Sequence, residues 1–181
     1  GYAGLNSECV GVYGSRQLVS HNTIHSSGRS VLGFGATRSK VAFNDISRAG
    51  LLTWDVGLFT TGNTDAGNSE VCFNWFHDNL SEGLARGIFL STGTHNLLIH
   101  HNVVWHCWEG GFHGEPPMEY VQLISNTFYS TPDSYDSGGI DVSSFTYVDD
   151  QIGGYVLNNV FTDDIRTLGH DVTIADNLLK G

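Results

Sequence analysis

The sequence predicts an all-β solenoid, in which short strands stack coil upon coil in one domain. Two observations predict this fold. A six-residue unit with apolar residues at its first and sixth positions and Asn at its fourth occurs seven times in 181 residues. A glycine followed by apolar residues recurs between the copies. Self-similarity at a period of about 20 to 30 residues indicates a repeat architecture, in which each unit is stabilised by its neighbours.

The Asn of each unit is expected to mark a bend between two strands. Asn tolerates the left-handed backbone conformation that such a corner requires. Stacked Asn side chains can also hydrogen-bond along the stack and hold the coils in register. We therefore predict a structural ladder, composed of Asn22, Asn44, Asn74, Asn102, Asn126, Asn159 and Asn177.

The glycine-led strands complete each coil. They begin at Gly33, Gly57, Gly87, Gly111 and Gly139. The units are rich in Val, Ile, Phe and Thr rather than in the Ala, Leu, Glu and Lys of helical repeats. This arrangement resembles the right-handed parallel β-helix family, in the pectate-lyase-like superfamily, over residues 16–179. We expect one β-helix domain over residues 1–181, with about six to seven coils and without end caps, as a fragment or a stacking module.

The composition limits the classes of partner that the protein can bind. Lys and Arg total 8 against 19 acidic residues, which gives a net charge of −11. This balance argues against nucleic acid and an anionic membrane as partners. It also weakens the case for a polyanionic substrate, unless metal ions bridge the like charges. No apolar run reaches the length of a membrane span, and a first residue other than Met indicates a processed or trimmed N-terminus. Cys9, Cys72 and Cys107 define no disulfide framework, and we expect at least two of them to be packed thiols.

Equivalent positions of successive coils should form columns about 4.8 Å apart. Three residues after the ladder Asn, one column contains His25, Ser47, His77, Trp105 and Tyr129. Such a column could be a sugar-binding strip or a stack that stabilises the corner. One residue before the Asn, His21, Phe43, Phe73 and His101 favour stacked packing.

The histidines are not expected to bind a metal ion. His100 and His101 are neighbours in a predicted strand, and alternation of side chains should send them to opposite faces. No transition-metal site and no cofactor are therefore predicted. A Ca²⁺ ion held by Asp and Glu remains possible.

Four acids near the glycine-led strands are the candidate catalytic groups. If the glycines that lead successive strands align, Phe59, Phe89 and His113 are neighbours, because each lies two residues after its glycine. The acids near these glycines then lie on one side of the coil stack. Paired carboxylates carry out glycoside hydrolysis, at separations of about 5 Å for retention or 6.5–9.5 Å for inversion. The candidate acid and base residues are Asp55, Glu109, Glu115 and Asp141, and the candidate substrate-binding residues are His77, Asp78, Arg86, Trp105, Trp108, His113 and Tyr129.

The spacing of Asp55, Gly57, Glu70, the run 74–78 and the run 100–105 resembles a subgroup of secreted bacterial β-helix proteins described as glycosidase-like. The resemblance implies an extracellular protein that acts on a neutral or weakly charged polysaccharide. A polysaccharide lyase is an alternative, with His113, Arg86 or Ca²⁺ to neutralise a uronate and take its proton. The non-enzymatic alternative is a structural module of an adhesin or spike, or a filament subunit that associates end to end through uncapped coils.

Overall fold

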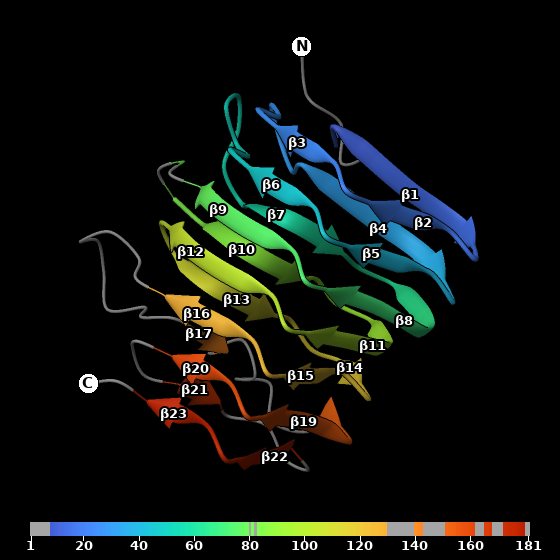
Figure 1. Ribbon diagram of the computed structural model, residues 1–181, viewed down its shortest axis with the longest axis vertical. Coiled ribbons are helices and arrows are strands. Elements are labelled where there is room, and N and C mark those ends of the chain that lie inside the picture. The colour runs from blue at the N-terminus through green and yellow to red at the C-terminus, as the bar shows by residue number, and fades with distance from the viewer. Residues whose placement is uncertain are drawn as a thin grey trace.

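The chain folds as a parallel β-helix in which successive coils stack on one another (Figure 1). The computed structural model describes residues 8–79, 81, 83–129, 140–142, 151–161, 165–167 and 172–179. Within these residues every regular element is a strand, and none is a helix that could cross a membrane. The predicted all-β solenoid is confirmed.

Three parallel sheets form the sides of the stack, and each coil contributes to each side. Sheet A has the order β1-β4-β7-β10-β13, and β17 lies beside β13 and pairs with β21. Its five strands are β1 (Val10–Ser15), β4 (Leu32–Thr37), β7 (Val56–Thr61), β10 (Ala85–Leu90) and β13 (Gly110–Gly114), and β17 (Ile140–Val142) and β21 (Ile165–Thr167) form a separate two-stranded sheet.

Sheets B and C flank the Asn corner. Sheet B contains β2 (Leu18–Ser20), β5 (Lys40–Ala42), β8 (Thr64–Cys72), β11 (Thr94–His100), β15 (Gln122–Ile124), β19 (Gly154–Leu157) and β22 (Val172–Ala175), with β14 (Met118–Glu119) and β18 (Gln151–Ile152) beside this path. Sheet C contains β3 (Thr23–His25), β6 (Asp45–Ser47), β9 (Trp75–Asn79), β12 (Val103–Cys107), β16 (Thr127–Tyr129), β20 (Val160–Phe161) and β23 (Leu178–Leu179).

The seven predicted Asn residues form a continuous hydrogen-bonded series along the corner between sheets B and C. Asn44 shows the pattern: its side-chain amide donates to Asn74 Oδ1 at 2.9 Å, and its backbone N–H donates to the same oxygen at 3.0 Å. The amide also donates to the Val19 carbonyl of the coil before, at 2.9 Å. The same contacts recur from Asn22 to Asn177. The ladder therefore joins each coil to both of its neighbours.

The expected left-handed conformation lies one residue earlier than predicted. The Asn residues themselves are not left-handed at the corner, whereas the residue before each one is, with φ of 57° at Phe43, 55° at Phe73 and 54° at His101. This placement leaves the Asn side chain directed along the stack, where it can make its hydrogen bonds. The left-handed residue in turn projects outward, which accounts for the column of rings at this corner.

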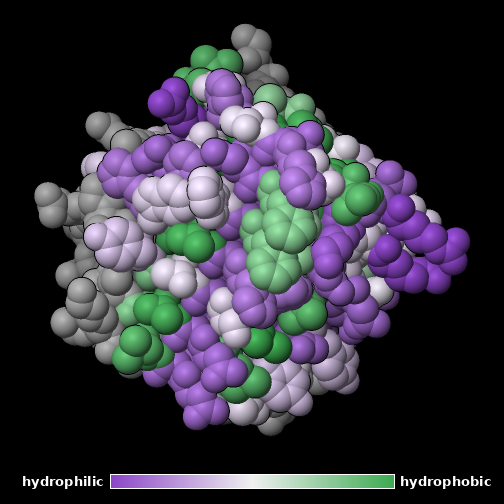
Figure 2. All heavy atoms as spheres, viewed as in Figure 1, coloured by the Kyte–Doolittle hydropathy of each residue, from purple (hydrophilic) through white to green (hydrophobic). Residues whose placement is uncertain are grey.

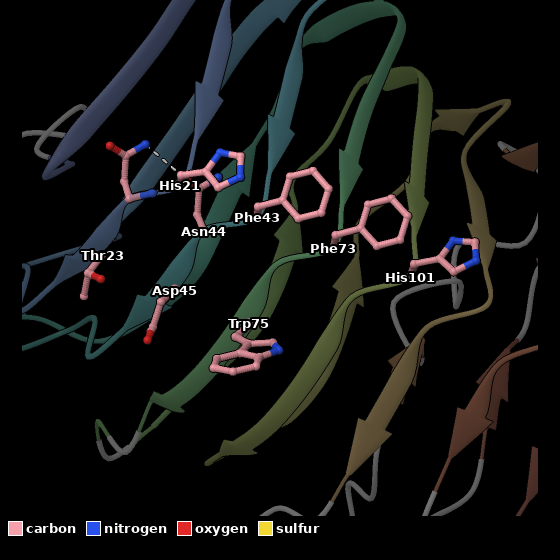
Figure 3. A pocket seen from close by; sticks show the side chains of 9 residues that line it. His21, Thr23, Phe43, Asn44, Asp45, Phe73, Trp75 and His101 are labelled. Carbon is pink, nitrogen blue, oxygen red and sulfur yellow. Dashed lines mark hydrogen bonds between the residues drawn. The ribbon is translucent and has the colours of Figure 1, made fainter.

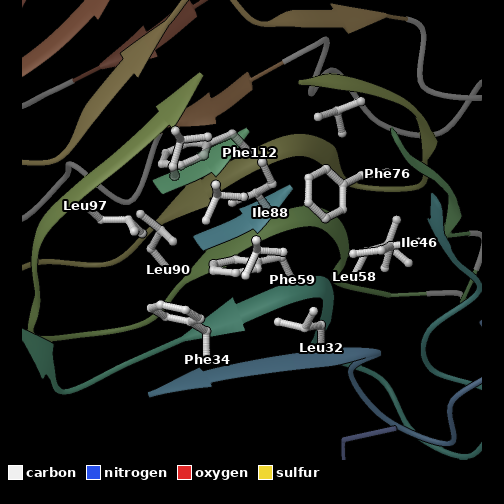
Figure 4. Packing of buried hydrophobic residues seen from close by; sticks show 14 of the residues in the cluster. Leu32, Phe34, Ile46, Leu58, Phe59, Phe76, Ile88, Leu90, Leu97 and Phe112 are labelled. Carbon is white, nitrogen blue, oxygen red and sulfur yellow. The ribbon is translucent and has the colours of Figure 1, made fainter. Parts of the chain in front are cut away.

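Apolar side chains from all three sheets fill the interior (Figure 4). Leu32, Phe59 and Ile88 enter it from sheet A, and Phe76 enters it from sheet C. Each of these four side chains is fully buried. Gly87 of sheet A lies close against sheet C, since a Cβ there would stand 2.3 Å from Val104 Cγ1. Close packing of this kind is what requires glycine in the strand.

The three cysteines are free thiols, of which two are buried and Cys9 is exposed. This confirms the prediction of at least two packed thiols. Cys107 lies in the core, and burial raises its pKa to about 12.

Candidate functional site

A cleft of about 510 Å³ runs over sheet A. Its lining combines acids, hydroxyl and amide groups and aromatic rings from several coils, among them Tyr13, Asp55, Asn63, Phe89, Ser91 and Glu115. Two of the four predicted catalytic acids, Asp55 and Glu115, therefore share this cleft. The side chain of Asp141 lies outside the described part of the chain, although its backbone in β17 pairs with Arg166 of β21.

Arg86 joins two of the predicted acids at one end of sheet A. Its Nη1 lies 2.7 Å from Asp55 Oδ1, and its Nε lies 2.7 Å from Glu109 Oε2. The guanidinium carbon stands 4.3 Å from the centre of the Phe89 ring. The Arg86 side chain is 4% exposed and that of Glu109 is 18% exposed, whereas Asp55 is 49% exposed. This cluster is thus a largely buried ion-paired group that meets solvent at Asp55.

Glu115 stands apart from that cluster. Its Oε2 accepts a hydrogen bond from Ser91 Oγ at 2.9 Å. Asp55 precedes β7 and Glu115 follows β13, so they lie at opposite ends of their strands, which span roughly 20 Å at 3.3 Å per residue. The two acids in the cleft therefore do not form a pair at the separations used in glycoside hydrolysis.

The predicted register of sheet A is correct in one step and wrong in the other. Phe89 pairs with His113 as expected, and their rings meet edge to face at 5.5 Å. Phe59, however, pairs with Ile88, and Thr60 takes the position beside Phe89. Gly57 aligns with Arg86 rather than with Gly87, which moves Phe59 by one position and turns it into the core. His113 itself is buried, so it is not an open binding residue.

The outer face of sheet C carries a second group of polar and aromatic side chains. His77 Nε2 lies 2.8 Å from Asp45 Oδ1, and His77 Nδ1 lies 2.8 Å from Asp78 Oδ2. His106 contacts the other oxygen of Asp78. The hydrogen bond from His106 lowers the pKa of Asp78, with a smaller contribution from His77. The His77 ring stacks on Trp105 at 4.4 Å.

This strip contains four of the seven predicted substrate-binding residues, whereas Arg86 and His113 lie on sheet A. The predicted column is confirmed, because His77 pairs with Trp105 and Trp105 pairs with Tyr129. Trp108 instead packs against the core. Asp45 was not predicted as a site residue, although its position directly after a ladder Asn places it on the same outer face.

The corner beside the strip forms an open groove of about 540 Å³ (Figure 3). The rings of His21, Phe43, Phe73 and His101 follow one another in a row, with successive centres 5.1 Å apart. Figure 2 shows several separate hydrophobic patches on a largely hydrophilic face. Stacked packing, as predicted for this column, is confirmed. The ring faces cover one another, and what they offer to a ligand is mainly their edges.

The prediction that His100 and His101 diverge is wrong. Their Nδ1 atoms lie 2.9 Å apart. His101 is the left-handed residue of its corner, and that conformation interrupts the alternation of side chains on which the prediction depended. His100 also lies near Glu70 and Cys72, so that three possible metal ligands gather on sheet B.

Comparison with known proteins agrees with the fold. The family model for a right-handed beta helix region matches residues 1–128 of the chain. This match includes all five hydrogen-bonded strands of sheet A and the cleft above them. No curated protein and no solved structure matches the chain.

Proposed function

The chain belongs to the right-handed β-helix family, and from this premise we propose that it is an extracellular carbohydrate-active protein that binds a neutral polysaccharide in the cleft over sheet A. One observation carries the proposal: successive coils bring acids, hydroxyl and amide groups and aromatic rings into one open cleft. Sugars are bound by this combination, because their hydroxyl groups need hydrogen-bonding partners and their apolar ring faces need a flat partner.

The charge of the cleft favours a neutral polymer. Glu8, Asp55 and Glu115 contribute three acids to the described lining, against the cation of Arg29. The whole chain adds a net charge of −11. A uronate polymer would meet repulsion here, because like charges in a cleft reinforce one another.

Polysaccharide lyase activity is less favoured than binding of a neutral polymer, because a lyase acts on a uronate. A lyase needs a cation to neutralise the uronate and a base to take a proton. Arg86 is buried and already contacts two carboxylates, and His113 is buried against Phe89. Neither residue has a free path to a polymer in the cleft.

Glycoside hydrolysis is the second candidate function, and a distance favours it. Asp55 and Glu109 each contact Arg86 at 2.7 Å, so their nearest oxygens lie within roughly 8 Å of one another, given the small span of a guanidinium. This upper bound includes the separations of both retaining and inverting hydrolysis. Since Arg86 stands between the two carboxylates, hydrolysis requires the sugar to approach from the exposed Asp55 side.

Three matched tyrosine variants test where the polymer binds. Tyr13 lines the cleft and is 57% exposed, Tyr129 on the sheet C strip is also 57% exposed, and Tyr155 on sheet B is 42% exposed. We expect Tyr13→Ala to weaken calorimetric binding of a neutral oligosaccharide roughly tenfold, as loss of an aromatic anchor does. Tyr155→Ala should leave binding unchanged.

Two results would contradict the proposal. Loss of binding in Tyr129→Ala with full binding in Tyr13→Ala would place the site on sheet C. Tighter binding of polygalacturonate than of neutral glycans would reverse the argument from charge. Hydrolysis is tested separately by release of reducing ends, which Glu109→Gln should abolish while polymer binding persists.

A further inference from the structure

Three side chains of different ligand types meet on the outer face of sheet B. Glu70 and Cys72 lie two residues apart in β8, with Val71 between them directed into the core. His100 lies in β11 of the next coil and pairs with Cys72. One ligand atom from each of the three lies within 4.8 Å of the other two. The β-helix itself creates this group, because it places one strand beside the next in fixed register.

The spacing suits a tetrahedral metal ion. Glu70 Oε2 and His100 Nε2 are 3.8 Å apart. Two ligands about 2.1 Å from a tetrahedral zinc ion lie about 3.4 Å apart, so a small side-chain adjustment closes the site. A thiolate, an imidazole and a carboxylate together favour Zn²⁺ over Ca²⁺ or Mg²⁺, which prefer oxygen ligands alone.

His100 is held in the orientation that a metal ligand needs. Its Nδ1 lies 2.9 Å from Nδ1 of His101, and its Nε2 faces Glu70. Metal-binding histidines commonly use one ring nitrogen for a neighbouring acceptor and the other for the ion. Burial lowers the pKa of His100.

A cation already lies at this position. The Lys40 ammonium is 2.7 Å from Glu70 Oε2 and also interacts with Cys72. The Lys40 side chain is 43% exposed and can turn toward solvent when another cation binds. Cys72 is completely buried, so its sulfur is shielded from bulk water.

We propose that Glu70, Cys72 and His100 bind one Zn²⁺ ion that links the third and fourth coils, with His101 as a positioning residue and the fourth coordination position open to water or a further ligand. Binding deprotonates the Cys72 thiol and displaces the Lys40 ammonium from Glu70. The thiol proton passes to the solvent, so affinity rises with pH. This site is independent of the carbohydrate cleft.

Cobalt substitution tests the proposal directly. Addition of Co²⁺ to the metal-free protein should produce a thiolate-to-metal charge-transfer band and the intense visible bands of tetrahedral cobalt, saturating at one equivalent. Zn²⁺ should then remove both signals. An octahedral spectrum without a thiolate band, or no saturable binding, would overturn the proposal.

Variants assign the ligands. Cys72→Ser should eliminate the charge-transfer band, whereas Cys9→Ser, at the exposed thiol, should preserve it. His101→Ala should weaken Zn²⁺ about 10- to 100-fold, as loss of an outer partner does. Lys40→Met should strengthen Zn²⁺ binding, because it removes the competing cation. Circular dichroism establishes that each variant is folded, and an unchanged Zn²⁺ affinity in folded Cys72→Ser would refute the site.

Discussion

Removal of Arg86 provides a quantitative test of how the end of sheet A is stabilised. Arg86 is 4% exposed and contacts Asp55 and Glu109, and its guanidinium lies over Phe89. Arg86→Ala would leave Glu109, which is 18% exposed, without its counter-ion. Breaking a buried ion pair from one side costs about 3–5 kcal/mol, whereas an exposed pair contributes at most about 1 kcal/mol.

We therefore expect Arg86→Ala to lower the free energy of unfolding by about 3–5 kcal/mol. Asp55→Asn should cost less than about 1 kcal/mol, because Asp55 is half exposed and rehydrates. For a chain of this size the Arg86 variant should melt roughly 6–20 °C lower than wild type.

The assay is urea denaturation followed by circular dichroism, with thermal melting as a second measurement. Arg48→Ala, at an exposed arginine, is the control and should change stability by less than about 0.5 kcal/mol. The reasoning is refuted if Arg86→Ala costs under about 1 kcal/mol, or if Asp55→Asn costs as much as Arg86→Ala.

Three further predictions concern the ladder, the close packing of the sheets and the sheet C strip. Asn74→Ala should cost about 3–4 kcal/mol in urea denaturation, because it removes the hydrogen bonds of buried groups on both sides. Asn22→Ala, at an exposed Asn, should cost under about 1 kcal/mol, and equal costs would contradict the ladder's role. Gly87→Ala should cost at least about 1–3 kcal/mol through overpacking, and a neutral effect in the same assay would contradict the close approach at Val104. The pKa of Asp78 is lowered from its ordinary value of 3.8, so its stabilising contribution is complete above that value and is lost as pH falls through the folded-state pKa. Wild type should accordingly lose its stability advantage over Asp78→Asn as the pH falls below 3.8, and a pH-independent difference would contradict this.

The sequence was sufficient to predict the coil stack, because its determinants are local and repeated. Each ladder Asn has a fixed place in its unit, so stacking of the coils brings Asn74 into hydrogen-bonding contact with Asn44 and Asn102. The column that places His77 beside Trp105 follows from the same count of residues. Counting from the Asn thus predicted which residues share a column, although the left-handed residue lies one position earlier than expected.

Prediction failed where the backbone departs from regular alternation. His101 is left-handed, so it turns toward His100 instead of away from it. The loops between the sheets differ in length, and the position of Gly57 relative to Gly87 could not be counted through them. The role of Arg86 needed coordinates as well, because the sequence predicted a substrate-binding residue and did not predict that Arg86 is buried between Asp55 and Glu109.

The location of the bound polysaccharide is the most direct test of the functional proposal. Amide and indole ¹H–¹⁵N spectra, recorded while a neutral oligosaccharide is added, would report on both candidate faces at once. The proposal predicts shifts at Asn63 and Ser91, which line the cleft over sheet A, and unchanged indole signals of Trp75 and Trp105 on sheet C. Shifts confined to the two indole signals, or none anywhere, would contradict the proposal, and the latter would favour the structural module.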